Sequence, residues 1–392
     1  MSRRQRSDAV VVGGGVVGAA CALMLSRLGL DVVLVEAGEP AAWSAERPDL
    51  RVYAFAADNA ALLDALGAWE PVRGARVQPY RRMHVWDAAA GDPLVFDADA
   101  FGRTELGWIV ENALLVDRLW SELRRGPVEL RCPARVEALE REDGGVRLRL
   151  DDGGSVAARV AIAADGAAST LRRLAGIAVG GHDYGQSGVV CYIETERGHE
   201  CTAWQRFLPT GPLAVLPFAG GRSSIVWTLP EDEARRMLAL DDDAFSRELT
   251  TAFGARLGGM RVVSKRVAFP LRRQLGVTQY AGGVLVVGDA AHAVHPLAGQ
   301  GVNLGLRDVS ALRDAILAAR ARRADWHSPH RLARWARQQR SRNALAAYAF
   351  GGINRLFSND NLAATLLRGH LLGLAGRLPP VPHLLWRRAA GL

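Results

Sequence analysis

The sequence is almost without lysine, and this shortage bears on how its positive charge is interpreted. Lys265 is the only lysine in 392 residues, so nearly all of the 49 basic residues are arginines, and the formal net charge is +8. No block of basic residues interleaved with aromatics runs along a stretch of groove size, as a nucleic-acid surface would need. Coding bias in a GC-rich genome accounts for the arginines, and we expect no nucleic-acid partner.

Cysteine is also scarce, which leaves no basis for a cysteine metal site. Thiols without a C-x-x-C pair or a histidine at metal spacing are typical of buried side chains in a reducing cytosol. His292 and His295 resemble a metal-binding pair, but no third ligand stands nearby at helical spacing, so we expect no metal. The four cysteines are scattered along the chain: Cys21, Cys132, Cys191 and Cys201.

No stretch of the chain is long and apolar enough to span a bilayer. The best candidate, Ala9 to Leu25, follows Arg3, Arg4 and Arg6 and so imitates a signal peptide. The three consecutive glycines from Gly13 to Gly15 would weaken a helix at its centre. We therefore expect the protein to stay in the cytoplasm.

Glycine is plentiful, and its first cluster lies between two short apolar segments. Residues 9–12 and 31–35 are rich in valine, as buried parallel strands are. Between them, residues 16–28 have helical spacing and end at Gly29, which is a helix stop signal. The start of the chain therefore predicts a strand, a tight turn, a helix and a second strand.

Strands of the parallel type recur in the middle and near the end of the chain. Residues 128–164 indicate three strands, and residues 284–287 indicate a last one. Between them, residues 181–230 alternate as an antiparallel sheet does, and the chain after Gly299 is mainly helical. The economical architecture is one discontinuous nucleotide-binding domain, with a second, β-rich domain made from the insertions.

The first turn has the spacing of a dinucleotide-binding motif, Gly13-x-Gly15-x-x-Gly18. Gly13 allows the tight turn, Gly15 lets the backbone approach a pyrophosphate, and Gly18 permits close packing of helix on strand. The helix N-terminus offers free N–H donors to phosphate. Glu36, at the end of the next strand, suits the two ribose hydroxyls and disfavours a 2′-phosphate. The motif predicts bound FAD or NAD.

A second glycine-rich motif favours FAD over NAD. Asp289 stands at the C-terminal end of the strand at 284–287, where its carboxylate can accept a hydrogen bond from a ribityl hydroxyl. Residues 295–305 then open a long helix, whose N-terminal N–H groups would face an anion. In a flavin site this anion is the N1/O2 edge of the reduced ring, where negative charge collects.

At this point the chain resembles a known family. Residues 295–308, HPLAGQGVNLGLRD, are similar to the signature of the ubiquinone-biosynthesis hydroxylases, which are flavoprotein monooxygenases. Residues 164–172 resemble the Asp-Gly motif of group A flavin hydroxylases, which is linked to both FAD and the pyridine nucleotide. Three more blocks follow the family's order, so that the likeness covers nearly the whole chain: 49–51, 106–112 and 355–360.

The resemblance implies an α/β fold. It consists of a Rossmann-like FAD-binding domain of the group A flavoprotein hydroxylase type, an inserted antiparallel β-sheet substrate domain and a helical C-terminus. The substrate pocket is expected in the β-rich insertion. By this likeness the FAD-binding domain comprises residues 1–72, 106–175 and 271–355, the substrate domain residues 73–105 and 176–270, and the C-terminal helical segment residues 356–392.

The resemblance also implies the residues of the site. The backbone around the flavin ring is expected from Pro296, Gly299, Gln300 and Gly301, and no side-chain base is assigned. The expected cofactor-binding residues are Gly13, Gly15, Val17, Gly18, Glu36, Arg51, Asn112, Asp165, Gly288, Asp289, Gly301, Val302 and Asn303.

Several of these residues have a plainer interpretation as well. Arg51 is otherwise a surface arginine, Asn112 a helix N-cap, and Asp165 with Arg172 an ion pair that supports a turn. A base near a phenol substrate has three candidates, each of which is otherwise a packing or surface residue: Tyr53, His84 and His182.

The reaction implied by the family is hydroxylation of an aromatic ring. NADH or NADPH reduces FAD and leaves, which fits the lack of a second glycine motif. O2 then forms a flavin C4a-hydroperoxide, which transfers its distal oxygen to the ring. The implied substrate is a small hydrophobic aromatic, a ubiquinone precursor that bears a polyprenyl tail.

Other functions fit the same motifs. The substrate can instead be an aromatic secondary metabolite, or the enzyme a prenyl-chain reductase, and a flavin-bearing scaffold is a non-enzymatic alternative. A halogenase is disfavoured because Lys265 lies far from the position that class needs. Residues 362–392 combine leucines with arginines, which suits a peripheral contact with the inner membrane, a partner in a biosynthetic complex, or a helix packed on its own domain.

Overall fold

The valine-rich segments build the centre of the first sheet in the computed structural model, which describes residues 6–88, 93–293 and 301–357. Its strands are β1 (Ser7–Val12), β2 (Val32–Val35), β8 (Glu129–Arg131), β9 (Val136–Glu142), β10 (Gly145–Leu150), β11 (Ser155–Ala163), β18 (Tyr280–Ala281) and β19 (Val284–Val286). The order is β18-β19-β11-β1-β2-β8, and β10 pairs with β11 and β9. β1 is parallel to both β2 and β11, as buried valine-rich strands predict.

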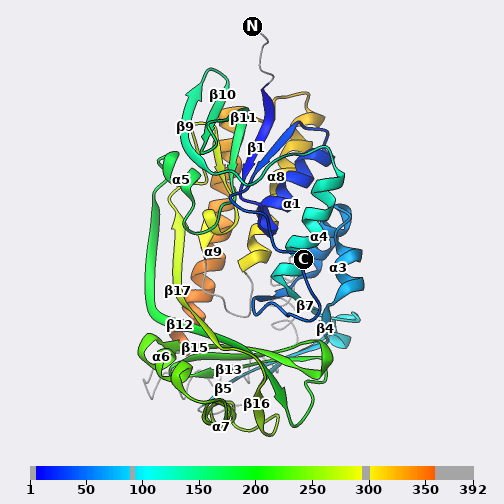
Figure 1. The fold of residues 1–392 in the computed structure, drawn as a ribbon, viewed down its shortest axis with the longest axis vertical. Helices are drawn as coiled ribbons and strands as arrows, with labels where there is room; N and C mark the ends of the chain where they lie inside the picture. The colour runs from blue at the N-terminus through cyan, green and yellow to red at the C-terminus, as the bar shows by residue number, and fades with distance from the viewer. Residues whose placement is uncertain (1–5, 89–92, 294–300, 358–392) are drawn as a thin grey trace.

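Both faces of this sheet are covered, because its strands are apolar on both sides (Figure 1). Val11 and Leu34 face a core shared with the helices, whereas Val10 and Val33 face β9, β10 and α5. The helices are α1 (Val16–Arg27), α2 (Ala57–Ala65), α3 (Trp69–Ala75), α4 (Asn112–Arg125), α5 (Thr170–Leu174), α8 (Gly301–Ala321) and α9 (Pro329–Phe357).

A second sheet lies at the other end of the molecule (Figure 1). Its strands are β5 (Arg82–Asp87), β6 (Leu94–Asp97), β12 (Val179–Thr195), β13 (Thr202–Leu208), β14 (Gly211–Pro217), β15 (Ser223–Pro230), β16 (Met260–Val262), β17 (Val267–Gly276) and β20 (His292–Ala293). They run in the order β20-β17-β12-β15-β14-β13-β5-β6, with β16 on β12. A small sheet, β3 (Val52–Phe55), β7 (Gly107–Glu111) and β4 (Gln78–Tyr80), has the order β3-β7-β4.

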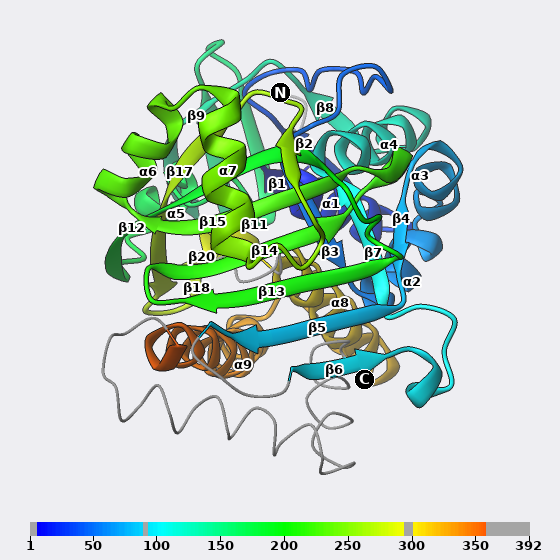
Figure 2. The ribbon, with the colours of Figure 1, turned by 90° about the horizontal axis from the view of Figure 1, so that it is seen from below.

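Two helices cover the outer face of the second sheet, as Figure 2 shows from below. They are α6 (Glu231–Ala239) and α7 (Asp242–Phe253). Phe245 and Phe253 of α7 are fully or almost fully buried against strand residues such as Trp227. The opposite face of the sheet is left for contacts with β3 and β7, through residues such as Val52 and Ile109.

The longest strands connect the two ends of the molecule (Figure 1). β12 and β17 pair from Val179 with Gly276 to Val190 with Val267, with an irregularity between Asp183 and Ser187. β17 therefore continues past residue 270, where the sequence predicts a domain boundary. The division into domains stays a prediction.

The α/β architecture expected from the sequence is confirmed, and its details differ in three places. Residues 128–164 form four strands and not three, because the short β8 adds to β2 in parallel. The insertion at 176–270 also contains α6 and α7. The second sheet is not wholly antiparallel, since β13 pairs with β5 in parallel. Those two strands come from different insertions, so no hairpin sets their direction.

Two other expectations concern the burial of the cysteines and the lack of a membrane-spanning segment. Cys21 and Cys191 are buried as predicted, whereas Cys132 and Cys201 are only half-buried. Within the described ranges, no helix combines the length and the apolar character needed to cross a membrane.

Candidate functional site

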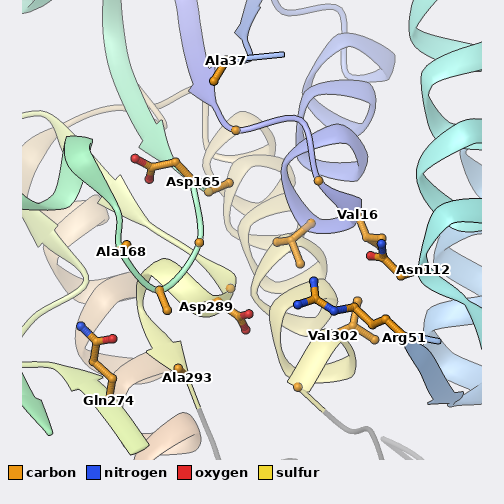
Figure 3. Close-up of a pocket in the computed structure, with 18 of the residues that line it drawn as sticks. Val16, Ala37, Arg51, Asn112, Asp165, Ala168, Gln274, Asp289, Ala293 and Val302 are labelled. Carbon is orange, nitrogen blue, oxygen red and sulfur yellow. The ribbon is translucent and has the colours of Figure 1, made fainter. Parts of the chain in front are cut away.

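A cavity of about 1010 Å³ opens where the turns of the first sheet face β3, β12, β15 and β17. Figure 3 shows Arg51 and Asn112 on one side of it, and Asp165 and Asp289 on the other. Most of the residues predicted to bind a cofactor line this one space: Gly13, Gly15, Val17, Glu36, Arg51, Asn112, Asp165, Gly288, Asp289, Gly301 and Val302.

The three glycines of the first turn have separate tasks. Gly13 has a φ of +103°, and a Cβ there would lie 2.4 Å from the Ala164 carbonyl oxygen. A Cβ on Gly18 would lie 1.9 Å from the Gly13 oxygen, so this residue lets α1 approach the turn, although it does not line the cavity. A Cβ on Gly15 would meet nothing within 4 Å and would project into free space. The open space at Gly15 is what the approach of a pyrophosphate requires.

Glu36 and Trp120 hold this turn from two sides. The Glu36 carboxylate accepts hydrogen bonds from the backbone N–H groups of Gly14 and Gly38. The Trp120 indole N–H of α4 donates to the Gly14 carbonyl, with a donor–acceptor distance of 2.7 Å. Glu36 also lines the cavity beside the turn, where an adenosine ribose would lie.

Arg51 and Asn112 are brought together by Asp49. One Asp49 oxygen accepts the N–H of Arg51 at 2.9 Å, and the other accepts that of Ala113 at 3.0 Å. Asp49 thus accepts a hydrogen bond at the N-terminus of α4. Asn112, for which an N-cap role was the plainer interpretation, does not supply this acceptor. The Asn112 side-chain oxygen instead accepts the Tyr53 hydroxyl at 3.1 Å. Arg51 is exposed, but it extends into the cavity (Figure 3).

A buried carboxylate holds the loop that carries Asp49. Glu111 has no exposed side-chain surface and accepts the Arg76 guanidinium at 2.8 and 3.1 Å. It also accepts the Asp49 N–H at 2.8 Å and the Trp43 indole N–H at 3.3 Å. The Tyr192 hydroxyl donates to the Asp49 carbonyl at 2.5 Å. This network fixes the backbone from which Arg51 reaches the cavity, and sequence reasoning did not identify it.

Asp165 and Arg172 organise the opposite wall. The Asp165 carboxylate accepts the Ser169 hydroxyl and the N–H groups of Thr170 and Leu171 at 2.8 and 3.1 Å, so it caps α5. Arg172 is buried and donates to the carbonyls of Ala167 at 3.0 Å and Ala290 at 2.8 Å. Arg172 thereby ties the Asp165 turn to the turn of Asp289. Burial lowers its pKa, against the attraction of Asp165.

Asp289 lies in the 3₁₀ turn η3 (Gly288–Ala290), directly after β19. The residue is exposed to the cavity, and its carboxylate faces the open space (Figure 3). Desolvation raises the pKa of Asp289, and the nearby His292 and Arg51 act in the opposite direction. A carboxylate in this place can accept hydrogen bonds from hydroxyl groups of a molecule in the cavity.

The start of α8 forms the floor of the site. Gly301 and Val302 line the cavity, whereas Asn303 is buried behind it. The Asn303 amide donates to the Ala54 carbonyl at 2.7 Å, and its oxygen accepts the Ala56 N–H at 3.0 Å. Asn303 thus joins α8 to the end of β3. Three residues expected around the flavin ring lie outside the described residues, and their role stays a prediction: Pro296, Gly299 and Gln300.

One wall of the cavity is apolar and was not found from the sequence. Gly188 of β12 leaves room for the Phe269 and Leu271 side chains of β17, since a Cβ there would lie 3.2 and 3.4 Å from them. The segments involved are adjacent only through strand pairing, which gives no local sequence signal. The apolar wall is formed by Leu50, Val52, Val190, Val226, Phe269 and Leu271.

The three candidate bases differ in position. Tyr53 lines the cavity, and burial raises its pKa to about 12, so it is a phenol at neutral pH. His84 packs against Trp204, with ring centroids 4.5 Å apart, and His182 packs against Tyr184 at 5.1 Å. Neither histidine lines the cavity. Among the residues that the structure describes, no three His, Cys, Asp or Glu side chains group in a way that could hold a metal ion.

The cavity fits FAD. Its lining combines Glu36 and the open face of Gly15, which suit the ADP half, with Asp289 and the start of α8, which suit the ribityl chain and the flavin ring. The FAD binding domain family matches residues 6–344. The solved structure of p-nitrophenol 4-monooxygenase PnpA from Pseudomonas putida has the same fold, with a TM-score of 0.75 and 22% identity over 98% of this chain and 97% of that one. The protein is an FAD-dependent monooxygenase.

Two relatives define the family more closely. Ubiquinone hydroxylase UbiL of Rhodospirillum rubrum is 38% identical over 387 residues, which cover 98% of this chain and 90% of that protein. The 3-demethoxyubiquinol 3-hydroxylase of Escherichia coli is 37% identical over 358 residues, or 91% of each chain. The chain belongs to the family of FAD-dependent hydroxylases of ubiquinone biosynthesis, and the predicted cofactor is confirmed.

Proposed function

We propose that the protein hydroxylates the aromatic ring of a polyprenylated ubiquinone precursor, with FAD as cofactor, NADH or NADPH as reductant and O2 as oxidant. The observation that carries this proposal is the apolar wall, which lies in the same cavity as the cofactor-binding turns. Such a wall can bind a flat hydrophobic ring next to a flavin and exclude water from it. The names of the two relatives support a quinone-type substrate.

We propose roles for the residues that line the cavity. The turn at Gly13 and Gly15 would bind the pyrophosphate, and Glu36 the adenosine ribose. Asp289 would accept a ribityl hydroxyl from one side, and Arg51 would contact the cofactor from the other. Bound FAD would supply the oxygen-activating chemistry, while these residues hold and orient it. The N–H groups of Gly301 and Val302 would stabilise negative charge at the flavin ring.

Asp289 offers the direct test of this cofactor site. Asp289→Ala removes an acceptor that faces the cavity, and a hydrogen bond to a charged group contributes about 1.5–3 kcal/mol. We expect FAD to bind at least about ten-fold more weakly, measured by titration of the apoprotein. Asp64→Ala, on the exposed side of α2, is the matched control and should bind FAD as the wild type does. Equal affinities of all three proteins would refute the role of Asp289.

The reaction itself is tested with the FAD-loaded enzyme, NADH or NADPH and a prenylated benzenoid. We expect a product that contains one oxygen atom derived from labelled O2, and no product without O2. Turnover that continues without O2 would instead indicate a reductase. Turnover of aromatic polyketides but not of the prenylated ring would indicate secondary metabolism. The intermediate that accumulates in a deletion strain would identify the ring position.

We propose that the domains follow the division expected from the sequence, with β12 and β17 passing between them. We also propose a cytoplasmic enzyme that touches the inner membrane or a biosynthetic complex through residues 362–392, which lie outside the described residues. Removal of residues 377–392 should weaken binding to anionic liposomes and leave FAD content unchanged. Undiminished liposome binding would argue against a membrane contact.

A further inference from the structure

A buried histidine–aspartate pair lies behind the turn that carries Asp289. The His292 side chain is 1% exposed and that of Asp308 is fully buried, and His292 Nε2 lies 2.6 Å from Asp308 Oδ2. The Gly288 N–H and the Asn343 side-chain amide also donate to Asp308, at 3.1 and 2.9 Å. The pair therefore joins β20, η3, α8 and α9 at one point, and neither side chain lines the cavity.

The hydrogen bonds restrict the protonation of this pair. Asp308 receives N–H donors from Gly288 and Asn343, so it acts as an acceptor in both bonds, as a carboxylate does. With Asp308 as a carboxylate, His292 Nε2 carries the hydrogen that the two side chains share. His292 Nδ1 is buried and has no hydrogen-bond partner in the described part of the chain. The ring is therefore either neutral with a bare Nδ1 or a cation.

The charges around the ring favour the cation. Burial alone would lower the pKa of His292, but the Asp308 carboxylate, together with Asp289, raises it above its ordinary value. Cys21 of α1 faces Asp308, and burial raises its pKa to about 12, so it adds no charge. Arg51 is the other cation that acts on Asp289, from across the cavity.

We propose that His292 is a positioning residue, held as an imidazolium by Asp308, whose charge keeps the Asp289 carboxylate ionised when the cofactor covers it. This inference rests on the proposed role of Asp289 in FAD binding. Without FAD, Asp289 faces an open cavity. A bound cofactor would displace that solvent, and an isolated carboxylate would then tend to take up a proton. A fixed cation behind the turn opposes this protonation without touching the cofactor.

His292→Gln tests the proposal, because a glutamine amide can still donate to Asp308 but has no charge. The measurement is the FAD dissociation constant of the apoprotein between about pH 5.5 and about pH 9. Loss of the cation raises the pKa of Asp289, so binding should weaken on acidification at a higher pH than in the wild type. We expect a loss of about ten-fold at the acid end, and the curves should converge at the alkaline end, where Asp289 is ionised in both proteins.

Two further variants keep the test decisive. Asp308→Asn removes the anion that holds the cation and should shift the curve in the same direction, which covers the case in which His292→Gln fails to fold. His330→Gln, at an exposed position of α9, should leave the curve unchanged. A pH-independent loss in the variants would mean that His292 is only a structural bridge, and unchanged curves would remove it from the site altogether. If Asp289→Ala itself binds FAD normally, the proposed cofactor role fails first.

Discussion

Tyr53 has two possible uses in the cavity, as a base or as a hydrogen-bond donor. Its hydroxyl donates to Asn112, and burial raises its pKa to about 12. A phenol with this pKa stays protonated at neutral pH, so it cannot accept a proton from a substrate. The structure therefore favours Tyr53 as a donor that orients Asn112.

Tyr53→Phe separates these uses. We expect FAD to bind about five-fold more weakly, since one hydrogen bond contributes about 1 kcal/mol. The pH profile of turnover should keep its shape from about pH 6 to about pH 10. Above that range the wild type should lose stability relative to the variant, because unfolded tyrosine ionises at its lower, ordinary pKa of about 10 while the folded residue does not. An alkaline limb that disappears in the variant would restore Tyr53 as a base.

Replacement of Glu111 should destabilise the protein. It is buried and holds Arg76 by two hydrogen bonds, so Glu111→Gln leaves the guanidinium without its counter-charge. Loss of one partner of a buried pair costs about 3 kcal/mol. Denaturant unfolding should show this decrease in the free energy of unfolding. The exposed Glu70, which pairs with Arg73, is the control, and Glu70→Gln should change stability by less than about 1 kcal/mol.

At the scale of elements, the turn between β1 and α1 needs glycine at two positions for different reasons, close packing at Gly18 and open space at Gly15. Gly18→Ala would place a Cβ 1.9 Å from the Gly13 oxygen, so α1 must move away from the turn. We expect a loss of stability of about 1–3 kcal/mol, as for other overpacked sites. Gly15→Ala has room for its Cβ and a φ of −66°, so its stability should stay within about 1 kcal/mol of the wild type.

FAD affinity should distinguish the same two variants. The Cβ of Gly15→Ala would occupy the space that the cofactor needs, so FAD should bind at least about ten-fold more weakly although the apoprotein is intact. Gly18→Ala should lose stability and affinity together. The measurements are thermal unfolding of the apoproteins and titration with FAD. Normal FAD affinity in Gly15→Ala would show that the cofactor does not approach this turn.

Elements that depend on neighbouring residues could be predicted from the sequence, whereas contacts that depend on the pairing of distant strands could not. The helix expected at 16–28 is α1, which ends one residue earlier at Arg27, because helical periodicity is a property of neighbouring positions. α6 and α7 were missed inside the insertion, although the acidic residues at 231–233 and the Asp241 N-cap are start signals. The apolar wall could not be predicted, since Val190 and Val226 meet only through the register of β12 and β15.

At the site, the residues of the two predicted glycine-rich turns could be predicted, but the contacts that support them could not. Gly13, Glu36 and Asp289 meet in one cavity as the motifs imply, because each stands at the carboxyl end of a parallel strand. Glu111 and Asp308 lie in runs that resemble the family, but their contacts with Arg76 and His292 could not be predicted from those runs. Asn303 belongs to the predicted run, yet its side chain contacts β3 and not the cavity.

At the scale of the whole molecule, residues of both large sheets line the cavity, so bound FAD should stabilise both. FAD at about 100 times its dissociation constant should raise the free energy of unfolding by about 2.7 kcal/mol. Because strands of both sheets line the cavity, we expect slower amide hydrogen exchange in peptides from β1 and from β15 alike. The loop between α6 and α7 serves as an exposed reference. Protection confined to the β1 peptides would show that the sheets unfold independently.

The parallel pairing of β5 with β13 has a consequence for synthesis of the protein. β5 must wait for a partner strand that is translated much later, and the cavity is lined by residues from Val12 to Val302. A nascent chain that ends before Asp289 therefore lacks one end of the binding site, whatever it has already folded. FAD can be captured only near the completion of translation, and the many distant contacts make the last folding steps slow. Free flavin present then or later can fill the completed site, so activation of the enzyme follows its synthesis.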